Sequence, residues 1–402
     1  MKTPELDLKE KILLGPGPSM VDRRVLEAMQ KGMFGYLDPD FMEILDDLAD
    51  KIGIVYNTKN RSMAIPGTGS AGMEAGLSSI LEPGDKVIMC VYGFFCERMV
   101  DMANRIGAHV IPIRADWGAP FPAELLELEI KKHKQVKLVT AIHGETSTGV
   151  KQDLSQMARI SKSYDALFMV DAVTTLGGTK IEVDKTGIDY IYSASQKCIG
   201  APPGLSPVSI SEKALESIRV RNSKPSSWYL DLGLLADYWG EDRIYHHTPP
   251  VSMVFALHKA YEILLEEGLE NRFARHKLNA EALIAGLSQL NIQVIPPLGS
   301  RLNQITPVWI PNDVDDEIVR SKLVNNYSIE IGKGLGEFSG RVWRIGLMGE
   351  SSKREYVLKL LSALEQIFNE CGLEVASGSA TRAANAHYES EDLKSLSNEL
   401  TI

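Results

Sequence analysis

A lysine and an aspartate each follow a hydrophobic segment, where a buried reactive group is expected. Lys197 comes directly after the small polar residues 193–196, and Asp171 ends the apolar run 167–170. A lysine amine attacks carbonyl carbon when desolvation removes its proton, and a carboxylate at the end of a core strand can hold a buried cation. Each residue alone has an ordinary alternative, because most lysines are solvated and an aspartate after a strand is often a helix N-cap.

A third segment has the residue types of an anion-binding site. Residues 67–71 (GTGSA) open a helix predicted at 73–81. Small residues let backbone N–H groups approach a phosphate, and the helix N-terminus favours its negative charge. The segment has neither the glycine spacing of a dinucleotide-binding loop nor that of a Walker A loop. Thr68, Gly69 and Ser70 therefore predict a site for a single phosphate.

Together these features fit one cofactor, pyridoxal phosphate (PLP). PLP has an aldehyde for the lysine, one phosphate for the helix start and a pyridine nitrogen that becomes an electron sink when an aspartate keeps it protonated. No metal site is predicted, since no two of the four cysteines form a CxxC pair. His246 and His247 are adjacent, and adjacent side chains of an extended chain point opposite ways.

The elements that must position these residues alternate between strand and helix. Such alternation predicts βαβ units, a largely parallel sheet, and ligands bound at the carboxyl ends of its strands. Asp171 and Lys197 are therefore expected at one edge of this sheet. The predicted strands are residues 86–91, 110–113, 137–142, 167–170, 190–193 and 208–210, and the predicted helices are 40–56, 73–81, 95–106, 124–133 and 154–164.

The last third of the chain predicts a second, smaller domain. It is helical from 253 to about 288 and then mixes strands with helices. The strands are expected at 305–310 and 342–347, and the helices at 317–325 and 353–369. We divide the chain into an extended N-terminal segment (1–20), a large domain (21–255), a small domain (256–376) and a C-terminal tail (377–402) that is loosely attached or docks on a partner.

The composition excludes several classes of partner. Of the 402 residues, 44% are hydrophobic and 24% are charged, which is ordinary for a globular protein. No stretch approaches the roughly 18 apolar residues of a membrane span. A net charge of −10 disfavours nucleic acid and anionic lipid. Four cysteines and an N-terminus without a long apolar segment predict a cytoplasmic protein.

Seven motifs, in the same order along residues 10–370, resemble those of the class V PLP-dependent aminotransferases. The nearest branch is that of the alanine–glyoxylate and serine–glyoxylate (serine–pyruvate) enzymes. The resemblance implies a fold-type I transferase, with a mostly parallel seven-stranded sheet and a smaller C-terminal α+β domain, acting as a homodimer that shares its active sites. The motifs are LLGPGP (13–18), GTGSAGMEA (67–75), HGETSTGV (143–150), VDAVTTLGG (170–178), SQKCIGAPPGL (195–205), YHHTPP (245–250) and VWRIGLMG (342–349).

The resemblance also implies roles for cofactor-binding residues. Lys197 would carry the Schiff base and move the substrate proton, and Asp171 would pair with the pyridinium nitrogen. Phe95 stands where relatives stack an aromatic ring on the cofactor, although an ordinary core phenylalanine is the alternative. Tyr245 and Thr248 would reach the phosphate from the partner subunit. The other expected contacts are Thr68, Gly69, Ser70 and Gln196 at the phosphate, Thr146 at the ring hydroxyl and Val173 behind the ring.

For the substrate, the resemblance implies a two-pronged grip by Arg344 on the carboxylate, with Tyr36 and Gly17 lining the pocket. The predicted reaction is ping-pong transamination between alanine or serine and glyoxylate or pyruvate. Two neighbouring activities are alternatives. Ureidoglycine–glyoxylate transaminases resemble the chain but carry amide side chains at the positions of Tyr36 and Tyr245. Pyridoxamine–pyruvate transaminases carry an acid at the position of Thr68.

Two rival interpretations come from other functional classes. A cysteine desulfurase on this fold needs a mobile nucleophilic cysteine near the second domain, where Cys371, at a predicted helix end, is the candidate. A binding protein without a cofactor would not need Lys197, Asp171 and Arg344 together. Both interpretations are therefore weaker than transamination.

Overall fold

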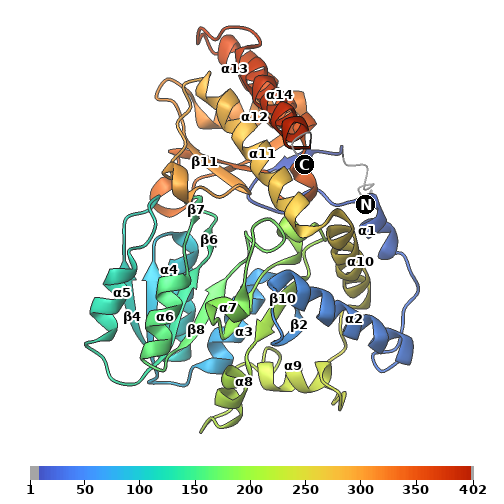
Figure 1. Cartoon of the computed structure of the whole chain (residues 1–402), viewed down its shortest axis with the longest axis vertical. Coiled ribbons are helices and arrows are strands. Elements are labelled where there is room, and N and C mark those ends of the chain that lie inside the picture. The colour runs from blue at the N-terminus through green and yellow to red at the C-terminus, as the bar shows by residue number, and fades with distance from the viewer. Residues whose placement is uncertain (1–8, 400–402) are drawn as a thin grey trace, which may run out of the picture.

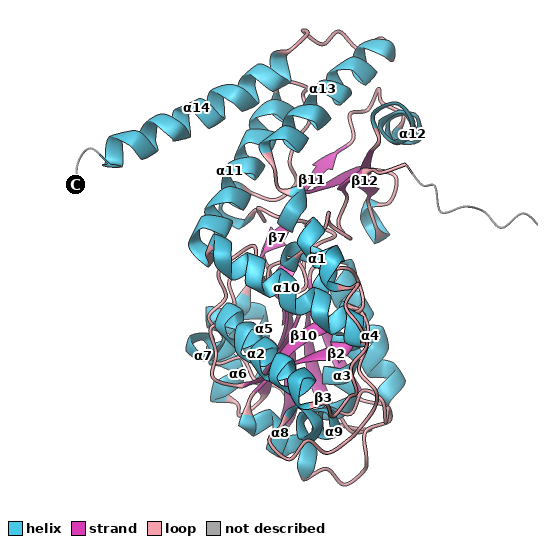
Figure 2. Ribbon diagram, turned by 90° about the vertical axis from the view of Figure 1, so that its right-hand side faces the viewer, coloured by secondary structure: helices cyan, strands magenta, loops and turns pink. Residues whose placement is uncertain are grey.

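A seven-stranded sheet lies at the centre of the larger part of the molecule, with helices on both sides of it (Figures 1 and 2). The computed structural model describes residues 9–399. Strand β10 runs in the direction opposite to the other strands of this sheet, so the sheet is mostly parallel. In spatial order the strands are β2 (Arg61–Pro66), β10 (Leu205–Ile210), β9 (Tyr190–Tyr192), β8 (Leu167–Asp171), β5 (Val136–Ile142), β3 (Lys86–Val91) and β4 (His109–Arg114).

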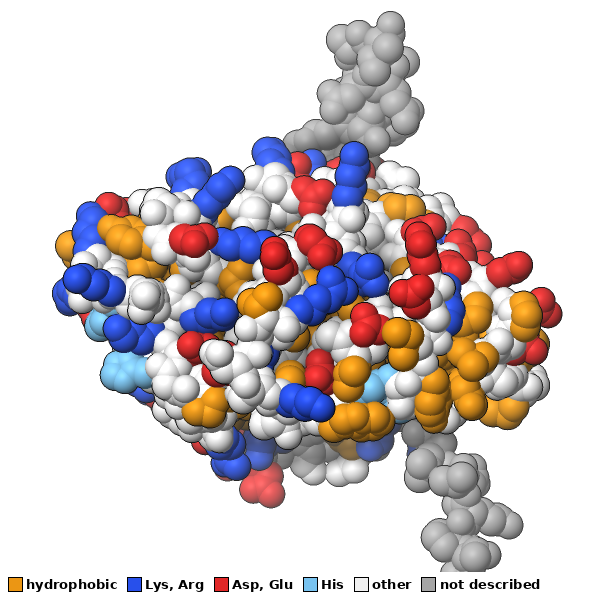
Figure 3. Space-filling view, turned by 90° about the horizontal axis from the view of Figure 1, so that it is seen from below, with side chains coloured by type: hydrophobic (Ala, Val, Ile, Leu, Met, Phe, Trp, Pro, Cys, Tyr) orange, Lys and Arg blue, Asp and Glu red, His pale blue; other side chains and the backbone are white. Residues whose placement is uncertain are grey.

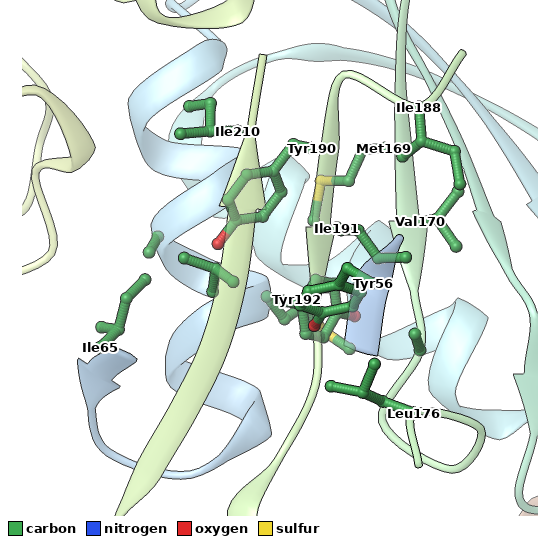
Figure 4. Packing of buried hydrophobic residues seen from close by; sticks show 14 of the residues in the cluster. Tyr56, Ile65, Met169, Val170, Leu176, Ile188, Tyr190, Ile191, Tyr192 and Ile210 are labelled. Carbon is green, nitrogen blue, oxygen red and sulfur yellow. The ribbon is translucent and has the colours of Figure 1, made fainter. Parts of the chain in front are cut away.

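The central strands form here because nearly every residue in them is apolar, as expected of strands covered on both faces. Figure 4 shows Tyr190, Ile191 and Tyr192 of β9 beside Met169 and Val170 of β8. The covering helices are α1 (Arg23–Ala28), α2 (Pro39–Tyr56), α3 (Gly69–Ile80), α4 (Phe94–Ile106), α5 (Ala123–Ile130), α6 (Ser155–Ser163), α7 (Val183–Thr186), α8 (Glu212–Arg219), α9 (Leu232–Trp239) and α10 (Val251–Glu267).

A four-stranded sheet and four helices form the second part, drawn at the top of Figure 1. The helices α11 (Leu269–Ser288), α13 (Arg354–Glu370) and α14 (Ser379–Glu399) lie together on one side of it, and α12 (Asp316–Tyr327) packs on β12 (Figure 2). In spatial order the strands are β1 (Ile12–Leu14), β12 (Ile329–Lys333), β13 (Val342–Gly346) and β11 (Ile305–Trp309).

The N-terminal strand β1 joins this second sheet, because it pairs in parallel with β12. The chain then returns toward the first sheet, so residues 15–20 cross between the two parts. The predicted extended segment 1–20 is therefore in part a strand of the C-terminal sheet, and its residues 1–8 lie outside the described residues. The proposed domain boundaries stay predictions.

The expected elements of the first sheet form close to their predicted positions. The helix after the glycine-rich turn begins at Gly69 and not at 73, because residues 69–72 already have helical geometry. The elements that were not predicted include strands β1, β2 and β12 and helices α1, α7, α8, α9 and α14. Among residues 9–399 no helix has the length and hydropathy needed to cross a membrane.

The C-terminal segment differs from the expected loose tail. It forms α14, whose buried side chains Ala380, Ala384 and Tyr388 pack on α11 and α13. The Tyr388 hydroxyl donates a hydrogen bond to Asn279 Oδ1 at 2.7 Å. Beyond this contact the helix extends past the helices that support it (Figure 2). Residues 400–402 lie outside the described residues.

Candidate active site

The carboxyl ends of the central strands meet at a cavity. Strand β8 ends at Asp171, and the turn after β9 carries Lys197. Both residues line this cavity, as the parallel-sheet prediction requires. The lining residues are Thr68, Gly69, Ser70, Met73, Phe95, Arg98, Ile142, Gly144, Thr146, Asp171, Val173, Ala194, Gln196 and Lys197.

Lys197 lies in a short π-helix, η1 (Ser195–Ile199), with a non-helical backbone at φ −105°, ψ −130°. Its ammonium Nζ donates a hydrogen bond to the carbonyl oxygen of Pro16. Gly17 has φ +112°, and a Cβ there would lie 2.5 Å from Nζ, so only glycine lets this segment approach the amine. Burial lowers the pKa of Lys197 to about 8, and the positive charge of Arg344 acts in the same direction. About a tenth of the amine is therefore unprotonated at pH 7, far more than for an ordinary lysine.

Asp171 is a buried carboxyl with two donors of its own. Its Oδ1 accepts a hydrogen bond from the Val173 backbone N–H at 2.7 Å, and its Oδ2 accepts one from the Tyr192 hydroxyl at 2.6 Å. Burial raises the pKa of Asp171 to about 7, against the lowering effect of these hydrogen bonds. A cation placed against this carboxyl would stabilise its ionised form, which fits a pyridinium nitrogen.

The N-terminus of α3 forms the opposite end of the cavity. Thr68 is the N-cap residue and makes no side-chain capping hydrogen bond. A Cβ on Gly69 would lie 2.8 Å from the Val173 side chain, so glycine is needed for this close packing. Among the described residues Gln196 Oε1 is buried without a hydrogen-bond partner. Free backbone donors at a helix start fit the phosphate of the expected cofactor. Gln196 could contribute a donor only through its Nε2, because its Oε1 accepts hydrogen bonds.

Thr146 and Phe95 complete the wall of the cavity. The Thr146 hydroxyl shares a hydrogen bond with the Thr174 hydroxyl. Phe95 is partly exposed and lines the cavity, and it also packs against the large hydrophobic core, so its contact with the cofactor stays a prediction.

Glu145 is a buried acid beside the site that sequence reasoning missed. Its Oε1 accepts hydrogen bonds from the Ser147 N–H and hydroxyl at 2.9 and 2.7 Å, and its Oε2 accepts one from the Phe95 N–H at 3.2 Å. Burial raises the pKa of this carboxyl. Glu145 thus fixes the first turn of α4, and no local pattern indicates it because Phe95 is 50 residues away.

Arg344 lies in the middle of β13 and is 5% exposed. Its Nε donates a hydrogen bond to the Lys333 carbonyl oxygen at 2.8 Å. Burial lowers the pKa of Arg344 to about 10, and the negative charge of Glu145 opposes this shift. Arg341 is exposed, with its guanidinium carbon 5.1 Å from the centre of the Trp309 ring. The two arginines therefore point opposite ways, as their strand positions predict.

Five expected site residues are not among those that line the cavity: Arg344, Gly17, Tyr36, Tyr245 and Thr248. The last three lie on the surface. Tyr36 and Tyr245 are 37% and 50% exposed, and their ring centres are 4.4 Å apart. The Tyr245 hydroxyl lies 3.4 Å from the hydroxyl of the exposed Thr248. Within one chain these residues face solvent.

The neighbouring histidines do not point opposite ways, so that expectation is wrong. His246 Nδ1 and His247 Nδ1 are 2.5 Å apart, and both rings are buried. The Trp228 ring stacks on His246 with centres 4.2 Å apart, which turns the two imidazoles toward each other. In residues 9–399 no group of three or more His, Cys, Asp or Glu side chains is placed to hold a metal ion.

The cysteines are poorly placed for desulfurase chemistry. Cys371 is exposed at the C-terminal end of α13 and does not line the cavity. Cys90, Cys96 and Cys198 are buried, and burial raises the pKa of each thiol. A thiol with a raised pKa is a poor nucleophile at neutral pH.

Comparison with known sequences gives one consistent family. The model of the family described as aminotransferase class-V matches residues 12–337. The (S)-ureidoglycine–glyoxylate transaminase of Bacillus subtilis (strain 168) is 37% identical over 404 residues, covering 96% of this chain and 97% of that protein. The alanine–glyoxylate aminotransferase of Felis catus is 39% identical over 371 residues, covering 91% of this chain and 89% of that protein.

Solved structures give the same family. The crystal structure of ureidoglycine–glyoxylate aminotransferase from Bacillus subtilis superposes with a TM-score of 0.93 at 38% identity, covering 96% of this chain and 100% of that one. The crystal structure of alanine–glyoxylate aminotransferase from Nostoc sp. has a TM-score of 0.89 at 41% identity, covering 92% of this chain and 98% of that one. The likeness therefore includes both sheets.

Proposed function

Because this chain belongs to the class V aminotransferases, which depend on PLP, we propose that it transfers the amino group of alanine or serine to glyoxylate or pyruvate. The observation that carries this proposal is the meeting of Lys197, Asp171 and the N-terminus of α3 in one cavity. These groups match the aldehyde, the pyridine nitrogen and the phosphate of PLP. When bound, PLP supplies an electron sink for charge that develops at the substrate α-carbon.

In this proposal the residues that hold PLP come from three places in the large sheet. Thr68, Gly69, Ser70 and Gln196 hold the phosphate, Asp171 holds the pyridine nitrogen, and Val173, Thr146 and Phe95 surround the ring. Asp171 can ionise beside a pyridinium because Tyr192 and Val173 already stabilise its oxygens. Lys197 would hold the cofactor aldehyde carbon covalently until the substrate amine displaces it, and the freed Nζ would then take the substrate α-proton.

Arg344 binds the substrate carboxylate in the proposed reaction. Its Nε is held by the Lys333 carbonyl, which leaves the two terminal nitrogens free for a paired contact with two oxygens. The backbone of Pro16 and Gly17 covers Lys197 from the opposite side and narrows the space for a side chain. A small amino acid donor therefore fits this site.

We also propose that the active form is a homodimer in which Tyr245 and Thr248 of each subunit complete the site of the other. Tyr245 lies among large hydrophobic side chains that face solvent, and such clusters mark interaction surfaces. Figure 3 shows one face of the molecule, with hydrophobic side chains gathered near one edge. The exposed residues before and around this segment are Leu26, Met33, Phe34, Leu37, Trp228, Tyr229 and Ile244. The free cysteines favour the cytoplasm as its compartment.

Ureidoglycine is the second candidate donor. It is favoured by the Bacillus subtilis relative, which matches this chain over nearly its whole length. The two exposed tyrosines, Tyr36 and Tyr245, are the argument against it, since a phenol has one hydroxyl where an amide has a separate carbonyl oxygen and NH2 group. Glyoxylate is common to the names of both groups of relatives.

Spectroscopy of the purified protein with PLP tests the proposal. We expect the absorbance of lysine-bound PLP to convert to that of the amino form with alanine or serine, and glyoxylate to reverse the change. Serine, alanine, glycine, cysteine, ureidoglycine and pyridoxamine are added one at a time. Conversion by ureidoglycine alone would move the assignment to the second candidate. Release of sulfide from cysteine without conversion, or no uptake of PLP, would contradict transamination.

A further inference from the structure

We propose that Arg98 is a phosphate-binding residue, the cationic member of the group formed by Thr68, Gly69 and Ser70. The inference rests on the proposed function, because it concerns the phosphate of PLP. Arg98 Nη1 donates a hydrogen bond to Ser70 Oγ at 3.1 Å, and Arg98 lines the same cavity. The guanidinium therefore lies beside Ser70, where the phosphate is expected.

Helix α4 delivers this side chain into the cavity. Arg98 follows Phe95 by three residues, so both lie on one helix face, the face that looks toward α3. The guanidinium carbon is 4.8 Å from the centre of the Phe95 ring and 5.8 Å from that of Phe94. These two rings and Ser70 hold the guanidinium in place before any anion binds, which reduces the entropy lost on binding.

The charge of Arg98 has no carboxylate partner. Within residues 9–399 no Asp or Glu oxygen lies within 4.0 Å of its guanidinium, as a salt bridge would require. Nearby arginines differ, because Arg105 pairs with Asp101 at 2.9 Å and Arg114 pairs with Glu97 at 2.7 Å. A cation that lines a cavity and lacks a counter-ion is suited to an anionic ligand.

The other charged residues of the cavity do not serve the phosphate. Lys197 is committed to the cofactor aldehyde in the proposed reaction, and Asp171 is negative when ionised. The chain's own phosphate ligands would otherwise be hydroxyls, backbone N–H groups and the Gln196 amide. Arg98 thus supplies positive charge for a phosphate that carries close to two negative charges at neutral pH. Its charge also contributes to the lowered pKa of Lys197.

Cofactor binding to three variants of the full-length apoprotein tests this role. Arg98→Met removes the charge, Arg98→Lys keeps a charge without the planar group, and Arg105→Met is the matched control on the same helix, where Arg105 is exposed. Each protein is titrated with PLP and with phosphate-free pyridoxal, and binding is followed by absorbance and tryptophan fluorescence. Thermal unfolding confirms that each variant is folded.

We expect Arg98→Met to raise the Kd of PLP by about tenfold to a hundredfold, the range for a lost charge-assisted hydrogen bond. The Kd of pyridoxal should change far less than that of PLP, because pyridoxal has no phosphate and Arg98 affects it only through its small effect on the pKa of Lys197. Arg98→Lys should lie between the wild type and Arg98→Met, and Arg105→Met should match the wild type. In Arg98→Lys the ³¹P resonance of bound PLP should shift from its wild-type position, which reports on the phosphate directly.

Two results would overturn the inference while leaving the proposed function intact. One is an unchanged Kd of PLP in Arg98→Met. The other is an equal loss of PLP and pyridoxal binding, which would mean that Arg98 only holds the Phe95 ring in position. Failure of the wild-type protein to bind PLP would instead overturn the proposed function, and this inference with it.

Discussion

The expected site residues fall into two regions that differ in burial and in hydrogen bonding. The first is the cavity at the edge of the large sheet, where Lys197 and Asp171 are buried and hydrogen bonded. The second is the surface segment around Tyr245 and Thr248, where both side chains are exposed. In the first region backbone groups fix the polar atoms. In the second, the side chains touch mainly one another and neighbouring aromatic rings.

This difference between the buried and the exposed region shows which part of the site a single chain forms by itself. The buried region has its geometry set before any ligand arrives, because the cost of burying a carboxyl and an amine requires partners for both. The exposed region carries no such requirement and leaves a hydrophobic surface uncovered. This contrast supports a site assembled from two subunits, one supplying the cavity and the other supplying Tyr245 and Thr248.

The largest effect should come from the buried region, from Lys197→Ala. We expect a loss of at least about a thousandfold in kcat, within the range for a general acid–base group. Within the described residues no other lysine lines the cavity that could replace its amine. Steady-state transamination measures the loss, with the exposed Lys213→Ala as control. Full activity in Lys197→Ala would contradict the assignment.

The same lysine predicts a pH dependence for cofactor uptake. Its pKa is lowered to about 8, so the fraction of reactive unprotonated amine rises through half at pH 8 and levels off about one pH unit above it. Stopped-flow absorbance of apoprotein mixed with PLP from pH 6 to 9.5 would show a rate that rises and then levels. A midpoint near the ordinary lysine pKa of about 10.4 would show that burial does not act as described.

The next effect tests the proposed contact with the substrate. Arg344→Lys should lower kcat/KM for the amino acid by about tenfold to a hundredfold, because a lysine cannot make the paired contact with a carboxylate. The Kd of PLP should stay the same, since Arg344 is not among the residues that line the cavity. Arg341→Lys, at the exposed residue directly before β13, is the control. Equal effects of the two variants would refute the contact.

A complementation experiment sharpens the comparison between the two regions. One variant carries Lys197→Ala, and the other carries Tyr245→Ala with Thr248→Ala. In a mixed dimer one site would regain an intact cavity and an intact partner segment. Refolding equal amounts together should therefore give about a quarter of wild-type activity at limiting PLP, from random pairing of subunits in a twofold dimer. Each variant alone is the control, and a mixture no more active than their average would show that each site is complete within one chain.

The smallest effect concerns stability and comes from Asp171→Asn. The pKa of Asp171 is raised to about 7, above the ordinary value of 3.8. The stability contributed by the protonated carboxyl is full below 3.8 and is lost as the pH rises through 7. The asparagine of the variant cannot ionise. The Tm of its apoprotein should therefore rise relative to that of the wild type between pH 5 and 8, by several degrees at pH 8.

Calorimetry of the two apoproteins across this range measures the gain, and Asp165→Asn, at an exposed carboxylate, is the control. The variant should also bind PLP more weakly, because the pyridinium loses its anionic partner. A Tm difference that is the same at pH 5 and pH 8 would show that the carboxyl does not titrate in this window.

Local sequence patterns were enough to predict most strands of the large sheet. Buried parallel strands are continuous apolar runs, and β3 and β5 lie where such runs occur. The missed strand β2 (Arg61–Pro66) begins with polar residues, and the missed β12 alternates glutamate and glycine with isoleucine. Helix α14 was missed because its sequence is polar around most of its circumference, and only a few small side chains contact its neighbours.

The sequence by itself determined which groups meet at the carboxyl edge of the sheet, because strand direction alone brings Asp171, Lys197 and the start of α3 to the same edge. Only the tertiary structure decided the contacts that join distant segments. Pro16 meets Lys197 across 181 positions, and Arg98 meets Ser70 across 28. Hydrophobic periodicity records which face of an element is buried. It does not record which polar atoms are brought together when two elements pack. Those tertiary contacts determine the surroundings of the Lys197 amine and the position of Arg98.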